Sequence, residues 1–319
     1  MSVSVSDLVV SIASPQDAVA MVEVIHSAFG ARLQVDPPSD ADQETAQSLA
    51  AKLRRGSGIY AQVDGRPAGV IVVMPDRDGV ARFSRVSVHP DFQRHGIASA
   101  MVTAAEELAA IRGFTRAELL ARTEFPEFIG LWQHRGFIVD RRVEPGVILA
   151  KQLPLAIKVP TSDAMRLLGE RLAQLLRRGD VILAAGDLGA GKTTLTQGIG
   201  RGLGSEGPII SPTFVLSRIH PSRIGRPTLM HVDAYRLSTA SELDDLDLDA
   251  AVAESITVVE WGQGIAEGLA DDRLEIGIWT SEADSSASGD DSERVVTIRT
   301  VGPRWRVVEI GMLLQDDHD

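Results

Sequence analysis

Eight residues near the middle of the chain have the composition of a phosphate-binding loop. Residues 186–193 read G-D-L-G-A-G-K-T; they follow the apolar run 181–185 and precede T-L-T-Q. This order predicts a strand, a glycine-rich turn and a helix start. Glycines let backbone N–H groups close around phosphate oxygens, Lys192 would reach the outer phosphates, and the Thr193 hydroxyl would ligate Mg²⁺. The loop predicts binding of ATP or GTP, and the alternative is a glycine turn that binds nothing.

Two apolar runs downstream of the loop end in carboxylates. L-M-H-V-D ends at Asp233 and I-T-V-V-E ends at Glu260. Ligands of open α/β sheets bind at the carboxyl ends of strands, so we expect one acid near Mg²⁺ and the other to orient water. The alternative for each is an acid that caps a turn. Thr213, in S-P-T-F, is expected to sense the terminal phosphate, or else to belong to a plain Ser-Pro turn.

The N-terminal half contains a second candidate site. An apolar strand at 80–88 leads through a glycine into a helix predicted over 96–112. Backbone amides at such a helix start favour a pyrophosphate, because the helix dipole attracts anions. The alternative is a helix-entry glycine with no ligand. The residues expected to contact this ligand are Val86, Val88, Gln93, Arg94, His95, Gly96, Ala98 and Ser99.

The elements around these sites divide the chain in two, with a boundary expected near 151–154 between domains 1–152 and 153–319. Successive antiparallel strands around helices indicate an α+β fold with a mixed sheet for the first domain. The second domain alternates strand and helix and then becomes strand-rich, which favours an α/β sheet with some antiparallel strands. The first domain is predicted to have strands at 8–13, 58–63, 67–74, 80–88, 116–121, 137–140 and 147–150, and helices at 15–29, 41–55, 96–112 and 125–135.

Composition excludes several classes of function. The 319 residues include no cysteine, which excludes disulfides, thiolate nucleophiles and cysteine-based zinc sites. A net charge of −12 and 4% aromatic residues argue against a surface that binds nucleic acid throughout. Any role in RNA chemistry is therefore expected to act through a protein partner. Without a leader-like start or a long apolar stretch, the chain is expected to be cytoplasmic and to avoid membranes.

Five segments of the second half together resemble the bacterial TsaE family. They are G-D-L-G-A-G-K-T-T-L, S-P-T-F, H-V-D-A-Y-R-L, E-L-D-D-L-D-L-D and V-V-E-W-G, in that order, within about residues 155–315. The resemblance implies an ATPase that uses Mg²⁺ and serves the threonylcarbamoyl modification of the adenosine beside the tRNA anticodon. It also implies a complex with TsaB and TsaD proteins, in which TsaD performs the transfer and tRNA is met indirectly.

The same resemblance implies roles for individual residues. Lys192, Asp233 and Glu260 would be catalytic, and Thr193 and Glu260 would hold the metal. The implied ATP-binding set is Asp187, Leu188, Gly189, Ala190, Gly191, Lys192, Thr193, Thr194, Thr213 and Trp261. The rival interpretation is a small P-loop kinase of a metabolite, whose arginine-bearing lid would have to come from the short segment 218–226.

The N-terminal segments resemble the GNAT acetyltransferase family over about residues 8–151. The residues concerned are V-S-V-H-P-D-F-Q-R-H-G-I-A-S-A-M at 86–101 and L-W-Q-H-R-G-F at 131–137. The resemblance implies acetyl-CoA as cofactor and transfer to an acceptor that the sequence does not identify. Trp132 stands where the family often has a tyrosine acid, and an indole N–H cannot serve as one. A CoA-binding scaffold is the alternative. Possible substitute acids or bases are His89, His95, Glu124, Glu127 and His134.

Overall fold

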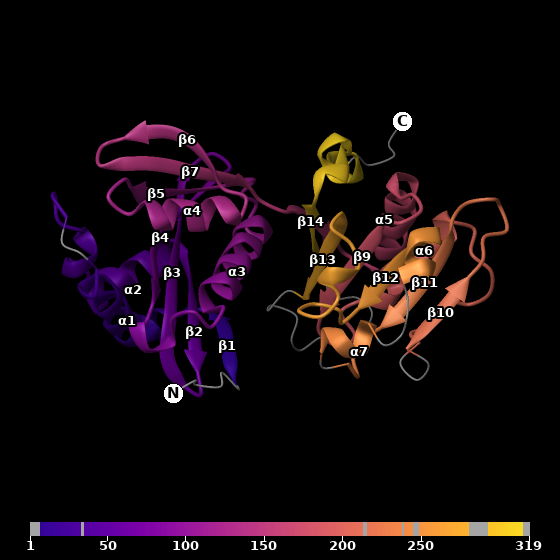
Figure 1. Ribbon diagram of the computed structural model, residues 1–319, viewed down its shortest axis with the longest axis horizontal. Helices are drawn as coiled ribbons and strands as arrows, with labels where there is room; N and C mark the ends of the chain where they lie inside the picture. The colour runs from indigo at the N-terminus through magenta and orange to yellow at the C-terminus, as the bar shows by residue number, and fades with distance from the viewer. Residues whose placement is uncertain are drawn as a thin grey trace. The chain divides into compact units, whose positions relative to one another are not determined.

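The computed structural model describes residues 7–32, 35–212, 216–237, 239–244, 249–280 and 293–314. Its contacts divide the chain into two compact units, Met1–Leu153 and Pro154–Asp319. Each unit is built around its own seven-stranded sheet (Figure 1). No helix in the described ranges is long and apolar enough to cross a membrane.

The sheet of the N-terminal unit is mixed. Its order is β1-β2-β3-β4-β5-β7-β6, and β4–β5 is the parallel pair among antiparallel neighbours. The β4–β5 register ends at Phe83 opposite Leu119, so the last residues of β4 separate from β5. The strands are β1 (Leu8–Ile12), β2 (Ser57–Val63), β3 (Arg66–Arg77), β4 (Val80–Val88), β5 (Arg116–Arg122), β6 (Ile138–Val143) and β7 (Gly146–Gln152).

Helices cover both faces of this sheet. α1 (Ala18–Gly30) and α2 (Ala46–Arg55) pack on one face, and α3 (Ile97–Ile111) and α4 (Pro126–His134) pack on the other. The single helix predicted over 41–55 is wrong at its start. A short 3₁₀ turn precedes Thr45, whose hydroxyl accepts a hydrogen bond from Ser48 N and caps α2.

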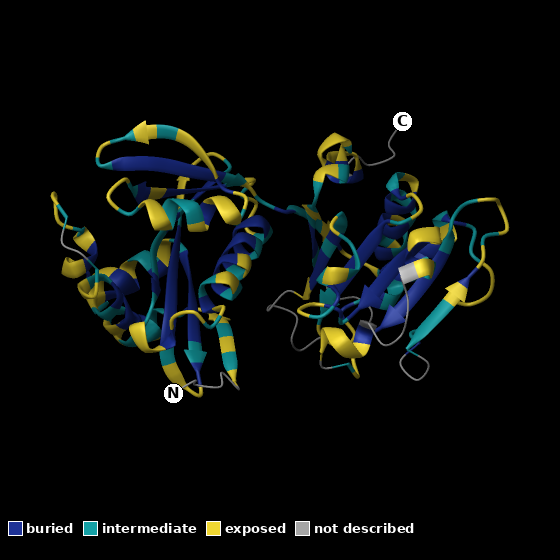
Figure 2. Ribbon diagram, in the orientation of Figure 1, coloured by how far each residue is buried: buried dark blue, intermediate teal, exposed yellow. Residues whose placement is uncertain are grey.

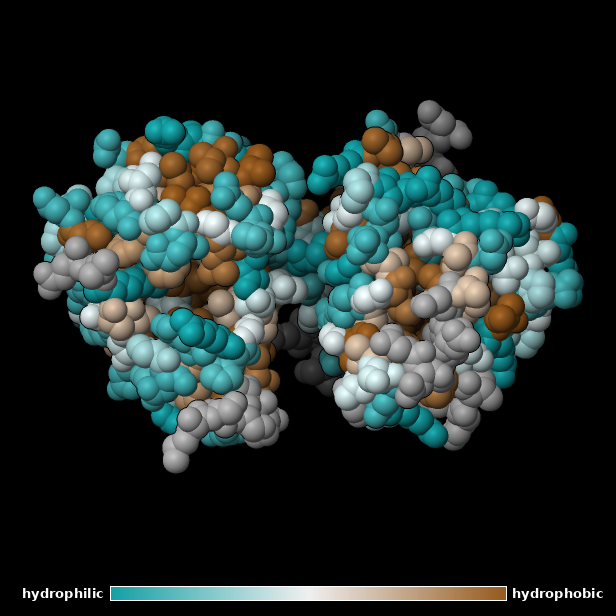
Figure 3. Space-filling view, in the orientation of Figure 1, coloured by the Kyte–Doolittle hydropathy of each residue, from teal (hydrophilic) through white to brown (hydrophobic). Residues whose placement is uncertain are grey.

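The surface of this unit is mixed in character. On the face drawn in Figure 3, hydrophobic residues gather over α4 and β6 among more numerous hydrophilic ones. Leu131 of α4 and Ile138 and Val139 of β6 are large apolar side chains that are exposed. Some exposed apolar surface is normal in folded proteins, so these side chains by themselves do not indicate a binding site.

The sheet of the C-terminal unit has a parallel centre and antiparallel edges. Its order is β10-β11-β12-β9-β13-β14-β8, with β11, β12, β9 and β13 parallel to one another. The central strands are buried, whereas the edge strand β10 is more exposed (Figure 2). The strands are β8 (Leu155–Val159), β9 (Val181–Gly186), β10 (Ser217–His220), β11 (Thr228–Asp233), β12 (Ser255–Glu260), β13 (Arg273–Thr280) and β14 (Arg294–Val301).

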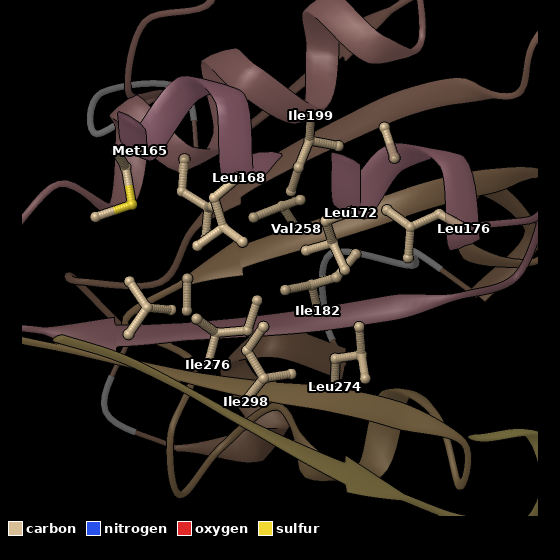
Figure 4. Close-up of a cluster of buried hydrophobic side chains, with 14 of the residues drawn as sticks. Met165, Leu168, Leu172, Leu176, Ile182, Ile199, Val258, Leu274, Ile276 and Ile298 are labelled. Atoms are coloured by element: carbon tan, nitrogen blue, oxygen red, sulfur yellow. The ribbon is translucent and has the colours of Figure 1, made fainter. Parts of the chain in front are cut away.

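Two helices cover one face of this second sheet. α5 (Ser162–Leu175) and α6 (Lys192–Gly202) enclose an aliphatic core with the central strands (Figure 4). α7 (Ala240–Asp244) and α8 (Asp249–Glu254) lie on the other face, where Leu243 and Val252 are buried. The segment 280–293 is small, polar and acidic, a composition that predicts a flexible loop between two strands, and it falls almost entirely outside the described residues. The two units thus have an α+β and an α/β architecture, as predicted.

Candidate functional site

The loop at 186–193 connects the end of β9 to the start of α6. Gly186, Gly189 and Gly191 have φ angles of 143°, 78° and 115°, in the region that favours glycine. A Cβ on Gly186 would also stand 2.6 Å from the Ile278 carbonyl oxygen. Gly191 is the N-cap of α6, so the first amides of the helix face the loop. The loop has the backbone of an anion-binding nest.

Lys192 is held at the inner side of this loop. It is only 5% exposed, and its Nζ donates to Gly186 O at 2.7 Å and to Asp187 O at 2.9 Å. Nζ also lies 3.7 Å from the centre of the Trp261 ring. Burial lowers the pKa of Lys192, and the carboxylates nearby only partly offset this effect. A buried ammonium beside backbone amides is suited to phosphate oxygens.

The two strand-end carboxylates lie side by side next to the loop. The parallel register pairs Asp233 with Glu260, and Glu260 with Ala184 of β9. Thr193 Oγ1 donates to Glu260 Oε1 and Oε2 at 2.9 and 3.1 Å. Asp233 accepts hydrogen bonds from Ser211 Oγ at 2.6 Å and from the backbone amide of Tyr235 at 3.0 Å. Both carboxylates are 3% exposed, so their orientation is set by these donors.

The second candidate site lies where β4 leads into α3. Arg94 and Gly96 have φ angles of 66° and 76°, and Gly96 is the N-cap of α3. Ala98 and Ser99 belong to the first turn of α3, whose amides have no partner within the helix. Val86 and Val88 lie beyond the last residue of β4 that pairs with β5. An anion would be favoured by this helix start. Gln93 is exposed and His95 is half-buried.

Comparison with known proteins separates the same two halves. Residues 159–288 match the family model for the threonylcarbamoyl adenosine biosynthesis protein TsaE. The tRNA threonylcarbamoyladenosine biosynthesis protein TsaE of Streptomyces coelicolor is 50% identical over 150 residues, which span 99% of that relative and 47% of this chain. The chain belongs to the TsaE family. The TsaE protein of Mycobacterium leprae is 51% identical over 116 residues, covering 72% of that relative and 34% of this chain.

The N-terminal unit is a GNAT domain that precedes the TsaE domain. Residues 21–137 match the family model for the acetyltransferase (GNAT) family. Among solved structures, the PaiA N-acetyltransferase of Thermoplasma acidophilum in complex with coenzyme A is 16% identical, with a TM-score of 0.41, over 46% of this chain and 99% of that one. Separately from the GNAT match, the solved structure of Bacillus subtilis YdiB is 30% identical, with a TM-score of 0.38, over 50% of this chain and 90% of that one.

The oxygen donors of the TsaE domain fit Mg²⁺. No group of three or more His, Asp or Glu side chains that could hold a metal occurs among the described residues. Mg²⁺ is commonly held by one or two carboxylates together with substrate phosphates, so a site completed by the nucleotide matches this chemistry. The hydroxyl of Thr193, at the end of the loop, and the carboxylate of Glu260 are already in contact and are oxygen donors of this kind.

The other described residues predicted for the nucleotide site lie in the loop, in the first turn of α6 and directly after β12. Trp261 has a φ of 61°, and its ring meets Tyr235 edge to face at 5.3 Å. Leu188 at the loop tip is 91% exposed, whereas Ala190 is buried. Thr194 lies in the first turn of α6. Thr213 lies outside the described residues, so its role stays a prediction.

Sequence reasoning missed His231. It is 0% exposed, and its Nε2 lies 2.7 Å from Glu260 Oε1. His231 stands two residues before Asp233, so strand alternation puts both on one face of β11. That periodicity could have placed His231 on the face of Asp233, but the contact with Glu260 depends on the order of the strands in the sheet.

Two arginines at the GNAT site were not singled out from the sequence. Arg135, next to Gly136 after α4, donates from Nη2 to Ser99 Oγ in the first turn of α3. Arg32 donates to Val86 O at 3.3 Å and lies 3.9 Å from the Phe29 ring centre. Contacts between residues distant along the chain leave no periodic signal, so only the fold shows them.

Neither Trp132 nor Glu124 of the GNAT domain has the surroundings of a catalytic proton donor or acceptor. Trp132 is 7% exposed and packs edge to face on Phe137 at 4.9 Å, so it belongs to the core. Glu124 accepts a hydrogen bond from Arg122 at 2.6 Å, and this bond lowers the pKa of Glu124. A carboxylate with a lowered pKa is a weak base.

The contacts of the three candidate histidines and of Glu127 do not identify any of them as the catalytic acid or base. His89 Nδ1 accepts the Asp91 amide at 3.3 Å, and His134 Nδ1 lies 2.7 Å from Gly130 O. Glu127 lies in the first turn of α4, and His95 Nδ1 is buried without a hydrogen-bond partner in the part of the chain that the structure describes. Their catalytic use stays a prediction.

Proposed function

We propose that this chain is an ATPase of tRNA threonylcarbamoyladenosine biosynthesis, joined to a GNAT domain that binds acetyl-CoA. The nucleotide site is inferred mainly from the contact between Thr193 and Glu260. Thr193 ends the glycine-rich loop, and the backbone of this loop also binds the side chain of Lys192. A phosphate nest, a cation and a metal-binding carboxylate converge there. The pathway comes from membership of the TsaE family.

Each side chain has a distinct task in this proposal. The loop amides and Lys192 bind the outer phosphates and neutralise their charge. Phosphate oxygens would replace the Gly186 and Asp187 carbonyls as acceptors for Lys192 Nζ. Thr193 and Glu260 would hold Mg²⁺, which would supply positive charge next to the terminal phosphate. Asp233, beside Glu260, orients the attacking water.

Partners follow from the same reasoning. TsaB and TsaD proteins are the proposed partners, and tRNA is reached through them in the cytoplasm. A net charge of −12 disfavours direct binding of a polyanion over a broad surface. ATP turnover here would keep the partner that performs the transfer active.

Two substitutions test the nucleotide site. Lys192→Ala and Glu260→Gln are each expected to lower ATP turnover by about 100-fold or more, because each removes a charge from the site. Both should also stop threonylcarbamoyladenosine formation in a reconstitution with TsaB, TsaD and tRNA. ADP release and modified tRNA are the measurements. Wild-type turnover in either variant would refute the site.

Matched controls separate these effects from loss of charge in general. Lys158→Ala removes a lysine that is 79% exposed, and Glu254→Gln removes an acid just before β12 that is 75% exposed. Neither should change ATP turnover by more than about twofold, since surface ion pairs contribute little. ADP release that requires an added metabolite and no tRNA partner would instead favour a kinase.

For the GNAT domain we propose that the pyrophosphate of acetyl-CoA binds at the start of α3. The left-handed residues Arg94 and Gly96 turn the chain into the helix, and its free amides face an anion. Transfer to an amine would proceed by direct attack of the deprotonated amine on the acetyl carbon, which forms the C–N bond while the C–S bond of acetyl-CoA breaks. Because Trp132 cannot supply an acid, the proton that the nitrogen loses would pass through water to the departing CoA thiolate.

Two glycines at opposite ends of α3 provide a matched test. Gly96 and Gly113 both have positive φ, and a Cβ on either would meet nothing within 4 Å. An alanine costs similar strain at both positions, but only Gly96 lies at the proposed site. Titration calorimetry should show acetyl-CoA binding weakened about tenfold in Gly96→Ala and unchanged in Gly113→Ala. No heat with the wild type would remove the proposal.

A further inference from the structure

His231 is a buried polar side chain that the proposed mechanism does not use. Its ring is 0% exposed in β11, and its Nε2 lies 2.7 Å from Glu260 Oε1. The same carboxylate accepts the hydroxyl of Thr193 from α6. Glu260 is therefore held by two donors from two different elements. A polar ring buried in a central strand costs free energy unless its hydrogen bonds are made.

The strand register places His231 on the face of the sheet that α6 covers. His231 pairs with Val258 in β12, just as Asp233 pairs with Glu260. Side chains two residues apart share a face of a strand, so His231 and Asp233 point to the same side. Val258 belongs to the core formed with α6, which identifies that side as the α6 face. His231 thus reaches Glu260 from within the protein and not from the nucleotide side.

The hydrogen bond between the two has one possible direction. An ionised carboxylate only accepts, so the ring donates from Nε2. Nδ1 is buried with no hydrogen-bond partner in the described ranges of the chain. All the hydrogen bonding of the ring that the structure describes is thus directed at Glu260. Partners of this kind orient the ligands of metal sites in other proteins.

We propose that His231 is a positioning residue for Glu260. It holds the carboxylate toward Thr193, so that Mg²⁺ meets an oriented ligand and Glu260 need not lose side-chain freedom when the metal binds. The proposal rests on the nucleotide site described above. It predicts that His231 contributes to the gain in nucleotide affinity that Mg²⁺ produces. It predicts no contribution of His231 to nucleotide affinity in the absence of Mg²⁺.

The decisive comparison is between His231→Asn and His231→Gln. The amide of Gln extends about as far as Nε2 of the ring, whereas the amide of Asn extends only as far as Nδ1. The affinity of a fluorescent ATP analogue is measured in EDTA and in Mg²⁺ for each full-length protein. We expect His231→Asn to reduce the gain in affinity from Mg²⁺ about tenfold. Binding in EDTA should stay within about twofold, and His231→Gln should keep most of the gain.

A double-mutant cycle tests whether the effect passes through Glu260. In a Glu260→Ala background, His231→Asn should reduce the gain from Mg²⁺ no further, because the carboxylate it positions is gone. An equal loss in both backgrounds would mean that His231 acts by another route, and the proposal would fall.

Each other result of these binding measurements also decides for or against the role of His231. The proposal is overturned if the Asn and Gln variants behave alike, or if His231→Asn weakens binding in EDTA as much as in Mg²⁺, which would indicate a merely structural role. A wild type that does not bind the ATP analogue would refute the proposed function and this inference with it. Binding that responds to Mg²⁺ equally in the wild type and His231→Asn would refute the inference alone.

Discussion

Glu118 is a buried carboxylate that forms ion pairs with three arginines. Its side chain in β5 is 0% exposed and is bound by Arg77, Arg116 and Arg141 at 2.5, 3.1 and 2.9 Å. Burial by itself would raise the pKa of Glu118. The hydrogen bonds from Arg141, Arg77 and Arg116 outweigh burial and lower the pKa to about 2 from the ordinary 4.5.

We expect Glu118→Gln to lower the free energy of unfolding of the GNAT domain by about 3 kcal/mol at pH 7, because three arginines lose their buried carboxylate. A carboxylate with a lower pKa in the folded state stabilises the fold above its unfolded pKa. The stabilisation is lost as pH falls from about 4.5 towards 2. The difference between wild type and variant should therefore shrink over that range.

Urea unfolding at a series of pH values measures this difference. Glu23→Gln, on an exposed position of α1, is the control and should show no more than about 0.5 kcal/mol at any pH. A Glu118→Gln effect that persists unchanged at pH 2 would show that the ion pairs are not its source.

At the scale of elements, the close approach of α5 and α6 sets the position of the phosphate loop. A Cβ on Gly198 would stand 2.1 Å from the Arg166 carbonyl oxygen, and one on Gly169 would stand 2.4 Å from the Leu195 carbonyl oxygen. Each helix thus uses a glycine where it meets the backbone of the other. Since α6 begins at Lys192, a shift of this helix would move Lys192 and Thr193 with it.

We expect Gly198→Ala to destabilise the TsaE domain by about 2 kcal/mol or more, because backbone atoms must move apart. Helix propensity alone predicts the opposite sign, since alanine is favoured over glycine by about 1 kcal/mol. Gly130→Ala, in α4 with nothing within 4 Å of the added Cβ, is the control and should stabilise its own domain slightly. Thermal unfolding of both variants provides the comparison, and stabilisation by Gly198→Ala would contradict the packing described.

At the scale of the whole molecule, the chain contains two units with separate cores. One unit packs its sheet between α1–α2 and α3–α4, and the other between α5–α6 and α7–α8. The contacts divide them after Leu153. A ligand that binds one folded unit stabilises that unit by mass action.

We therefore expect MgATP and acetyl-CoA to act on different unfolding transitions of the same protein. At about 100 times the dissociation constant, each ligand should add about 2.7 kcal/mol to the unit that binds it. Scanning calorimetry of the full chain, with each ligand in turn, makes the measurement. The Lys192→Ala variant should lose the MgATP shift and keep the acetyl-CoA shift. One transition that responds equally to both ligands would contradict independent units.

Much of the fold was readable from the sequence because its signals are local. Apolar runs at period two or as short blocks predicted the strands, and the change to helical spacing predicted the helices. The start of α2 was missed because Thr45 caps a helix that the pattern extended backwards to residue 41. The loop at 186–193 was predicted because its chemistry is carried by consecutive residues.

The sequence by itself determined which residue types are available and the strand, loop and helix that carry the phosphate nest. Only the tertiary structure decided that Asp233 and Glu260 are neighbours, because the sheet order β11-β12-β9 depends on crossovers and not on spacing. The same holds for His231 beneath Glu260 and for Arg135 beside Ser99. Hydrogen bonds between distant segments depend on how sheets and helices pack, and packing energy is shared among many residues. No short stretch of sequence therefore encodes such a contact.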